Sequence, residues 1–473
     1  MRPETSATVR SASLPPLAAG LPLLGNVREL AADPRAFLFE QYQRLGPIFR
    51  VRALHQRFTV LAGPEATQFI TRQGARHFSS HDFWSGMDEE FEAARSLISM
   101  DGPEHTRMRM AQKNGYSRTV IERRLPDVVE MVRQATQAWP VGEALPVHAV
   151  LQRLVTEQLG QLVARTSPEG YVDDLIFFVR MALQTRVTRL LPGVLRLLPR
   201  YRRAKARVHA LGRAVLAAHE TPPPEGQPAN LIDALLALSR EDPDFLPSSD
   251  LLISVLGPFI AGLDTVASTG AFVLHALLTQ PALLERVTVE VDALFAEGPP
   301  AAARLRQLDV LHRTVLETLR MYPIAPAITR TVVEPFSFGG HEVARGEKVL
   351  IGTTVAHYLE KFYPNPTVFD IDRYLPERNE HRNPGAFAPY GAGPHICLGA
   401  GFAEVHLMIL VAALLHTVRL AVDPPEYRLR IDPAPTPHPD KGFRMKVLAH
   451  RTTSAGVADP LLGGLQATQE PSR

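Results

Sequence analysis

Apolar positions recur with the spacing of an α-helix over most of the chain, which predicts a mainly helical protein. A few short stretches instead have the pattern of β-strands, near Ile48–Leu54, Phe58–Leu61, Thr329–Phe338 and Lys348–Ile351. We find no internal repeat. The pattern therefore predicts an α+β fold that is mainly α, with a small β-rich lobe.

Two apolar stretches predict long buried helices. The first runs from about Leu251 to Thr279, and the second runs from about Leu398 to His416. Pro258 removes a backbone N–H inside the first helix, which predicts a kink or a local loosening there. No apolar run approaches the ~18 residues of a membrane span, so we expect none.

Composition and charge narrow the class of protein. The formal net charge is +2 over 473 residues, which gives no support for a nucleic-acid partner. A hydrophobic content of 45% allows a large core, and length alone suggests two or three domains. We see no signal peptide and only one cysteine, which favours a cytoplasmic location in a reducing compartment.

Cys397 is that single cysteine, and its neighbours give it a special context. A free cysteine is most often a small buried hydrophobic residue. Here Gly391, Gly393 and Gly399 surround it, which suits a main chain that turns tightly beside a flat ligand. A helix is predicted to start next to it, where free N–H groups favour a thiolate. The segment is therefore a candidate thiolate loop for a metal.

The segment from Tyr390 to Ala400 resembles the haem-ligand loop of the cytochrome P450 family, whose pattern is Phe-Gly-x-Gly-x-His/Arg-x-Cys-x-Gly. The chain matches this pattern at Gly391, Gly393, His395, Cys397 and Gly399. It departs at Tyr390, whose hydroxyl needs a partner if it is buried. The resemblance implies haem b with an axial thiolate from Cys397, and a haem-binding role for the other loop residues.

The resemblance covers roughly Pro15 to Leu448 as one unit, which overrides the domain count from length. It implies the cytochrome P450 fold as a single triangular catalytic domain, with no reductase or ferredoxin module fused to it. The expected parts are a flexible N-terminus at 1–14, the domain at 15–450, its β-rich lobe near 30–65 and 329–352, its haem-ligand loop at 390–400, and a disordered tail at 451–473.

Glu317 and Arg320 are three positions apart, so they share a face of a helix. Alone, such a pair is most often a solvated ion pair of little energetic value. The resemblance implies instead that they form a buried network with Arg373. This network is expected to brace the segment that leads to the cysteine loop.

His105 and Arg109 are four positions apart and also share a helical face. One interpretation is an amphipathic surface helix with a basic stripe. The resemblance favours contacts with the haem propionates, joined by Arg330 and His395. Two carboxylates on an apolar macrocycle need several charge-assisted partners.

The predicted central helix carries Ala261, Gly262, Asp264 and Thr265. A threonine in a helix often only bonds the carbonyl of the preceding turn. The resemblance implies an oxygen-binding groove at Ala261 and Gly262, a hydrogen bond from Thr265 to oxygen at the iron, and a proton relay through Asp264. Thiolate ligation favours O–O cleavage, and cleavage needs protons, so the two features belong to one chemistry.

The resemblance also places the walls of a substrate pocket. These residues are mostly apolar, and they are Phe83, Trp84, Met87, Phe91, Phe259, Ile324, Ile328 and Phe443. An exposed position is an equal alternative for Trp84 and for Phe91. The composition suggests an apolar substrate of terpenoid, steroid or fatty-acyl type.

Electrons must come from an external partner, for which we expect an acidic ferredoxin or flavodoxin with its reductase. His395, Arg107, Lys113 and Arg118 are candidates for a positive docking face. The basic and apolar segment 187–205 is either a lid that touches a membrane surface or, as we favour, a lid with a solvated basic face. We expect a monomer.

The sequence thus indicates a monooxygenase that inserts one atom of O2 into an apolar small molecule. A non-oxygenating isomerase or a peroxygenase with the same haem ligation is an alternative, but Asp264 and Thr265 are intact. A haem-based sensor or binding protein is another, although no signalling domain is attached.

Overall fold

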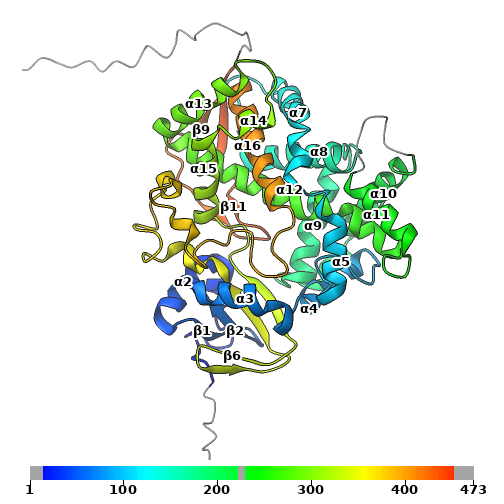
Figure 1. Ribbon diagram of the computed structural model, residues 1–473, viewed down its shortest axis with the longest axis vertical. Coiled ribbons are helices and arrows are strands. Elements are labelled where there is room, and N and C mark those ends of the chain that lie inside the picture. The colour runs from blue at the N-terminus through cyan, green and yellow to red at the C-terminus, as the bar shows by residue number, and fades with distance from the viewer. Residues whose placement is uncertain (1–13, 222–229, 452–473) are drawn as a thin grey trace, which may run out of the picture.

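The computed structural model describes residues 14–221 and 230–451. The predictions for residues 1–13 and 452–473 lie outside the described residues. Helices make up most of the described chain, and one end of the molecule carries a β-sheet (Figure 1). The predicted α+β class, mainly α with a small β-rich part, is confirmed.

The helices and strands follow one another along the chain with short connections. The α-helices are α1 (Val27–Ala32), α2 (Pro34–Leu45), α3 (Gly63–His77), α4 (His81–Glu90), α5 (Gly102–Lys113), α6 (Arg118–Glu122), α7 (Leu125–Gln137), α8 (Val147–Val163), α9 (Val172–Ala182), α10 (Pro199–Ala218), α11 (Leu231–Glu241), α12 (Ser248–Thr279), α13 (Pro281–Phe295), α14 (Ala302–Leu305), α15 (Asp309–Met321) and α16 (Ala400–Thr417). The strands are β1 (Ile48–Ala53), β2 (Gln56–Ala62), β3 (Phe78–Ser79), β4 (Ala144–Pro146), β5 (Ile328–Val332), β6 (Phe336–Phe338), β7 (His341–Val343), β8 (Lys348–Gly352), β9 (Val418–Asp423), β10 (Ile431–Asp432), β11 (His438–Pro439) and β12 (Arg444–His450).

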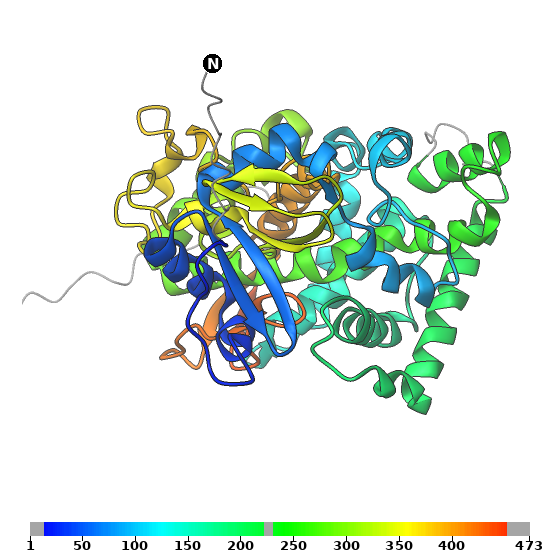
Figure 2. The ribbon, with the colours of Figure 1, turned by 90° about the horizontal axis from the view of Figure 1, so that it is seen from below.

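The largest sheet has the strand order β1-β2-β8-β5-β3 and joins segments from both ends of the predicted lobe. Strands β2 and β8 pair in parallel, with Val60 opposite Leu350, and the other pairs are antiparallel. This sheet faces the viewer when the molecule is seen from below (Figure 2). The segment predicted as the first part of the lobe holds β1 and β2 and also helices, because residues 27–32 and 34–45 form α1 and α2.

Helix α12 crosses the helical part and packs against α8, α10, α15 and α16. It is apolar on most sides, as expected for a helix that is buried all round. It runs through Pro258 without interruption, so a bend at this residue stays a prediction.

Helices α12 and α16 are long and apolar enough to span a membrane by length and composition alone, contrary to the sequence-based expectation. However, 61% and 72% of their most apolar windows are buried inside the protein, which is typical of core helices.

Candidate active site

The loop before α16 owes its shape to two glycines. Gly391 and Gly393 have φ values of +77° and +76°, which side-chain-bearing residues rarely adopt. A Cβ atom at Gly393 would also lie 2.6 Å from the carbonyl oxygen of Ile70 in α3. The N–H of Cys397 donates to the carbonyl of Tyr390 at 3.0 Å and closes the loop. The predicted tight turn therefore depends on Gly391 and Gly393, whereas Gly399 has an ordinary φ of −86°.

The thiol of Cys397 faces an internal space. Its surface is exposed, and yet surrounding protein desolvates it and raises the pKa of the thiol, opposed by the Gly399 N–H and by Arg109. A side chain that is exposed to solvent and yet surrounded by protein lies in a recess, so we infer that the thiol borders a space within the protein. Helix α16 begins at Ala400, close to the predicted start, and the Gly399 N–H before it favours the thiolate, although burial of the free thiol outweighs this effect.

Tyr116 connects the cysteine loop with the central helix. A Cβ atom at Gly399 would lie 3.7 Å from its ring, and one at Gly257 would lie 3.8 Å from its hydroxyl oxygen. Ala261 and Thr265 follow Gly257 at steps of four residues, so they share its face of α12. Ala261 is exposed although Phe259 and Leu263 beside it are fully buried. This face of α12 therefore lines the space on the side of the cysteine loop.

Gly262 lies on a different face of α12, against α8. A Cβ atom there would meet Leu159 Cδ1 at 2.8 Å, so glycine permits the close approach of the two helices. This packing accounts for the residue without an oxygen groove, and only Ala261 is exposed to the space.

Thr265 makes the bond to the preceding turn that helical threonines often make. Its hydroxyl donates to the carbonyl of Ala261 at 2.7 Å, which leaves the lone pairs of its oxygen free to accept. The carboxylate of Asp264 accepts from Gln152 Nε2 at 2.7 Å and lies 3.4 Å from His148 Nε2. Desolvation would raise the pKa of Asp264, but His148, Thr436 and His438 together outweigh it, and the pKa lies below its usual value. The acid and the alcohol therefore face different sides of α12, as their positions predict.

His105, Arg330 and His395 line one cavity of about 140 Å³, together with Asp101. The rings of His105 and His395 stack with their centroids 4.0 Å apart, and His395 lies 3.1 Å from an Asp101 oxygen. Burial and the charge of His395 lower the pKa of His105 to about 4. The structure thus brings together three of the four residues predicted for the propionates.

Two cations of this region form no ion pair with a carboxylate among the described residues. Arg330 is 6% exposed and donates to the Thr329 carbonyl at 2.7 Å, and desolvation lowers its pKa to about 10 although the charge of Asp101 opposes this shift. Desolvation also lowers the pKa of Arg109. A buried cation without an anion is costly, so these side chains fit a ligand that brings carboxylates with it. The residues present therefore fit haem.

Glu317, Arg320 and Arg373 form a fully buried network. Glu317 accepts from Arg320 Nε and Nη2 at 2.8 Å each and from Arg373 Nε at 3.3 Å. Arg320 Nη1 donates to the carbonyl of His357 at 2.7 Å, and His357 Nε2 accepts from the Ala388 N–H at 2.9 Å. These bonds connect α15 with the segment two residues before Tyr390, as the predicted bracing role requires.

The predicted pocket residues divide into two groups. Met87, Phe91, Phe259 and Phe443 are at most 2% exposed, whereas Phe83, Trp84, Ile324 and Ile328 are half-buried. Phe91 packs edge-on against Phe178 at 5.6 Å between ring centroids, so its exposed alternative is wrong. Trp84 packs against Phe83 at 5.3 Å.

Only part of the predicted docking face carries positive charge that is not paired with a carboxylate among the described residues. Arg107 pairs with Asp242 at 2.7 Å and lies over the ring of Phe245. Arg118 lies 3.5 Å from Glu122 and 3.6 Å from Glu404. Of the proposed cations, Lys113 makes no ion pair with the described residues and is exposed.

The basic and apolar segment 187–205 is tied to α4 through one carboxylate. Glu90 is 3% exposed and accepts from Arg186 at 2.7 Å and from Arg196 at 3.0 Å, with Lys205 at 3.5 Å. Four aliphatic side chains of the segment are exposed, at Leu190, Val194, Leu197 and Leu198.

The comparisons agree with this geometry. A family model for cytochrome P450 matches residues 15–447. Cyclooctat-9-en-7-ol 5-monooxygenase of Streptomyces melanosporofaciens is 26% identical over 85% of this chain and 88% of its own length. Abscisic acid 8'-hydroxylase 4 of Arabidopsis thaliana is 23% identical, with 90% of each chain covered. The retinoic acid-bound cyanobacterial CYP120A1 superimposes with a TM-score of 0.80 at 22% identity, over 93% of this chain and 100% of its own.

The fold, the arrangement of the site and the match to the family model identify the protein as a haem-thiolate monooxygenase. The chain belongs to the cytochrome P450 family, and its cofactor is haem b with an axial cysteine thiolate. Because the chain has one cysteine, that thiolate is Cys397. Tyr116, His148 and Gln152 were not predicted. Only the packing of distant segments places them beside the loop and Asp264, so no local pattern could have found them.

The hydroxyl of Tyr390 is buried without a hydrogen-bond partner among the described residues. An unsatisfied buried hydroxyl is destabilising, so Tyr390→Phe is expected to raise the free energy of unfolding by about 1 kcal/mol. Denaturant unfolding of the holoprotein measures this. Tyr363→Phe is the matched control, because that buried hydroxyl donates to the Ala386 carbonyl at 3.3 Å and its loss is expected to destabilise. A less stable Tyr390→Phe protein would show that the hydroxyl has a partner.

Proposed function

We propose that this monooxygenase inserts one atom of O2 into an apolar small molecule of terpenoid, steroid or fatty-acyl type. The apolar and half-buried side chains at Phe83, Trp84, Ile324 and Ile328 support this substrate class. The names of two relatives mention substrates of related character, cyclooctat-9-en-7-ol and retinoic acid. A spectral screen of such compounds against the purified holoprotein measures which of them enter.

Each site residue has a proposed role. Haem bound to a thiolate supplies the activation of O2, because the ligand pushes electron density toward the O–O bond. Cys397 holds the iron within the loop of Tyr390, Gly391 and Gly399. His105, Arg109, Arg330 and His395 bind the two propionates, which explains the two cations without carboxylate partners.

The remaining proposed roles belong to three residues of helix α12, on the other side of the space from the cysteine loop. Ala261 leaves room beside the helix, where a larger side chain would fill the exposed position. The oxygen of Thr265 accepts a hydrogen bond, because its own proton is held by the Ala261 carbonyl. Asp264 passes protons from the opposite side of the helix. This division of Thr265 and Asp264 between two faces is the observation that carries the proposal.

The electron donor is proposed to be a ferredoxin or a flavodoxin with its reductase, acting on a monomeric, cytoplasmic enzyme. Lys113 offers an exposed positive charge, whereas Arg107 pairs with Asp242 and Arg118 lies beside Glu122 and Glu404. Electrostatic docking weakens as salt screens the charges, so the turnover rate should fall with ionic strength. A rate that does not respond to salt would contradict this docking face.

Thr265→Ala tests the proposed oxygen chemistry. We expect NAD(P)H consumption to continue while product per electron pair falls about tenfold and hydrogen peroxide accumulates, because proton delivery loses a positioned group. The control is Thr279→Ala, since Thr279 makes the same 2.7 Å back-bond on the same helix far from the site. Unchanged coupling in Thr265→Ala would refute the role of the hydroxyl.

A further inference from the structure

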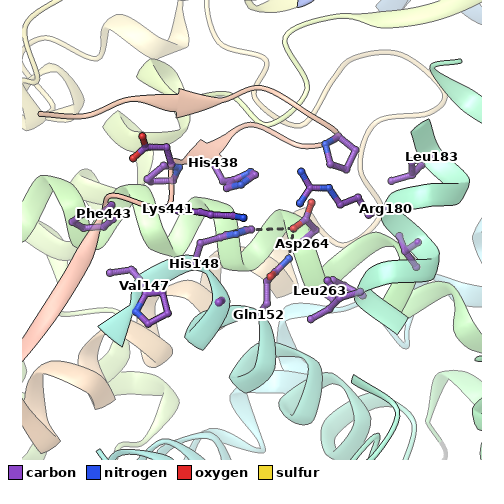
Figure 3. A pocket seen from close by; sticks show the side chains of 17 residues that line it. Val147, His148, Gln152, Arg180, Leu183, Leu263, Asp264, His438, Lys441 and Phe443 are labelled. Carbon is purple, nitrogen blue, oxygen red and sulfur yellow. Dashed lines mark hydrogen bonds and ion pairs between the residues drawn. The ribbon is translucent and has the colours of Figure 1, made fainter. Parts of the chain in front are cut away.

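A second cavity lies on the far side of α12 from the cysteine loop. It measures about 140 Å³ and lies between α8, α9, α12 and the hairpin of β10 and β11. Its polar lining consists of His148, Gln152, Arg180, Asp264, His438 and Lys441 (Figure 3), with Asp440 beside them. The side chain of Asp264 points into this cavity, and the lining residues Arg180 and Lys441 are exposed to solvent.

Helix α8 holds the carboxylate of Asp264 by two side chains. Gln152 Nε2 donates to Oδ1 at 2.7 Å, and His148 Nε2 lies 3.4 Å from the same oxygen and 3.1 Å from Ser268 Oγ. The side-chain amide of Gln152 alone would give this oxygen a hydrogen bond and would orient the carboxylate. The imidazole adds a side chain of the kind that serves as a proton shuttle in enzymes.

The ring of His148 stacks on His438 of β11, with centroids 4.0 Å apart and planes 17° apart. His438 Nδ1 lies 2.8 Å from the Thr436 carbonyl, so this nitrogen carries a proton. Its Nε2 lies 3.9 Å from Asp432, which also lies 3.9 Å from Arg180 of α9. A proton on either ring disfavours a proton on the other, because like charges repel at this distance.

We propose that His148 is the proton donor and positioning residue for Asp264, and that protons reach it through the cavity beside His438. The inference deepens the proposed function and rests on the proton-relay role of Asp264. In each cycle His148 Nε2 gives a proton to Asp264 Oδ1, and the imidazole is reprotonated from solvent in the cavity.

The charges around Asp264 keep it ionised at rest. Its pKa lies below its usual value, so a proton that it takes from His148 is held weakly and is readily passed on. Burial and the charge of His148 lower the pKa of His438. The charged groups that face the two stacked histidines are Asp264 from α12, Asp432 from β10, Arg180 from α9, and Asp440 and Lys441 after β11.

The test uses His148→Gln, which keeps an amide that can hydrogen-bond but removes the titrating ring. The control is His275→Gln. His275 lies on α12, the helix that carries Asp264, but three turns further along, where its ring contacts Phe443. Infrared spectroscopy of the reduced, CO-bound holoprotein follows the carboxyl band that Asp264→Asn removes. The pKa of Asp264 is expected to rise in His148→Gln and to stay unchanged in His275→Gln.

Turnover provides the second measurement. Product formation by His148→Gln is expected to fall about tenfold, which is less than the usual effect of removing a positioned proton donor, because Gln152 still holds the carboxylate. The dependence of the rate on pH near neutrality should also flatten, which a merely structural role would not cause. An unshifted Asp264 titration, or a pH profile like that of the unaltered enzyme, would overturn the inference. If the unaltered enzyme oxygenates nothing, the proposed function fails, and the infrared titration alone decides whether His148 controls Asp264.

Discussion

Cys397→Ser is expected to reduce oxygenation to the level seen without enzyme. Serine is close in size, but its oxygen cannot replace the electron donation of a thiolate to the iron, on which O–O cleavage depends. The chain has no second cysteine that could take over. Product formation with a reconstituted electron chain measures the loss, and the haem content of the variant is determined in parallel.

Gly401→Ala is the matched control for this variant. Gly401 lies in the first turn of α16, and an added Cβ atom would meet only Arg118 Cβ at 3.9 Å. Its activity should therefore remain near that of the unaltered enzyme. Oxygenation that survives in Cys397→Ser would contradict the assignment of the ligand.

Glu317→Gln is expected to lower the free energy of unfolding by about 3–5 kcal/mol, the usual cost of breaking a buried charge network. Glutamine has the same shape, but it leaves Arg320 and Arg373 with one buried carboxylate fewer. Glu317 also accepts from the Asp370 N–H at 3.0 Å and from the Tyr374 hydroxyl at 3.1 Å, so several bonds weaken together. Denaturant unfolding and haem retention measure the effect.

The chain offers a close control in Glu130→Gln. Glu130 and Arg133 form the same i,i+3 pair at 2.6 Å, but their side chains are 47% and 43% exposed. Exposed pairs of this kind contribute about 0.2–1 kcal/mol, so the loss should be far smaller. Equal losses in the two variants would show that burial of the network adds nothing.

Much of the site could be predicted because its residues lie in short motifs. The glycines around Cys397 lie within a single loop, and Glu317 and Arg320 lie on one helical turn. The resemblance to the cytochrome P450 family implied their roles before their positions were known, and it also implied that Arg373 joins the network. The structure shows this contact of Arg373 with Glu317, which spans 56 residues.

Other features depend on tertiary packing and could not be read locally. Strand β4 has three residues and pairs with β12 about 300 positions later, so its pattern alone is too short to predict it. Gly262 could be taken for part of an oxygen groove because nothing in the sequence shows Leu159 of α8 against it. His148 reaches Asp264 only because α8 and α12 lie side by side. The thiol pKa of Cys397 likewise depends on desolvation by distant segments.

The central claim is the bond between the iron of haem and the sulfur of Cys397. Its most direct test is the absorption spectrum of the purified, reduced protein with carbon monoxide bound. The account predicts the spectrum of a thiolate-ligated haem, and its loss in Cys397→Ser. The spectrum of an imidazole-ligated haem in the unaltered protein would contradict it.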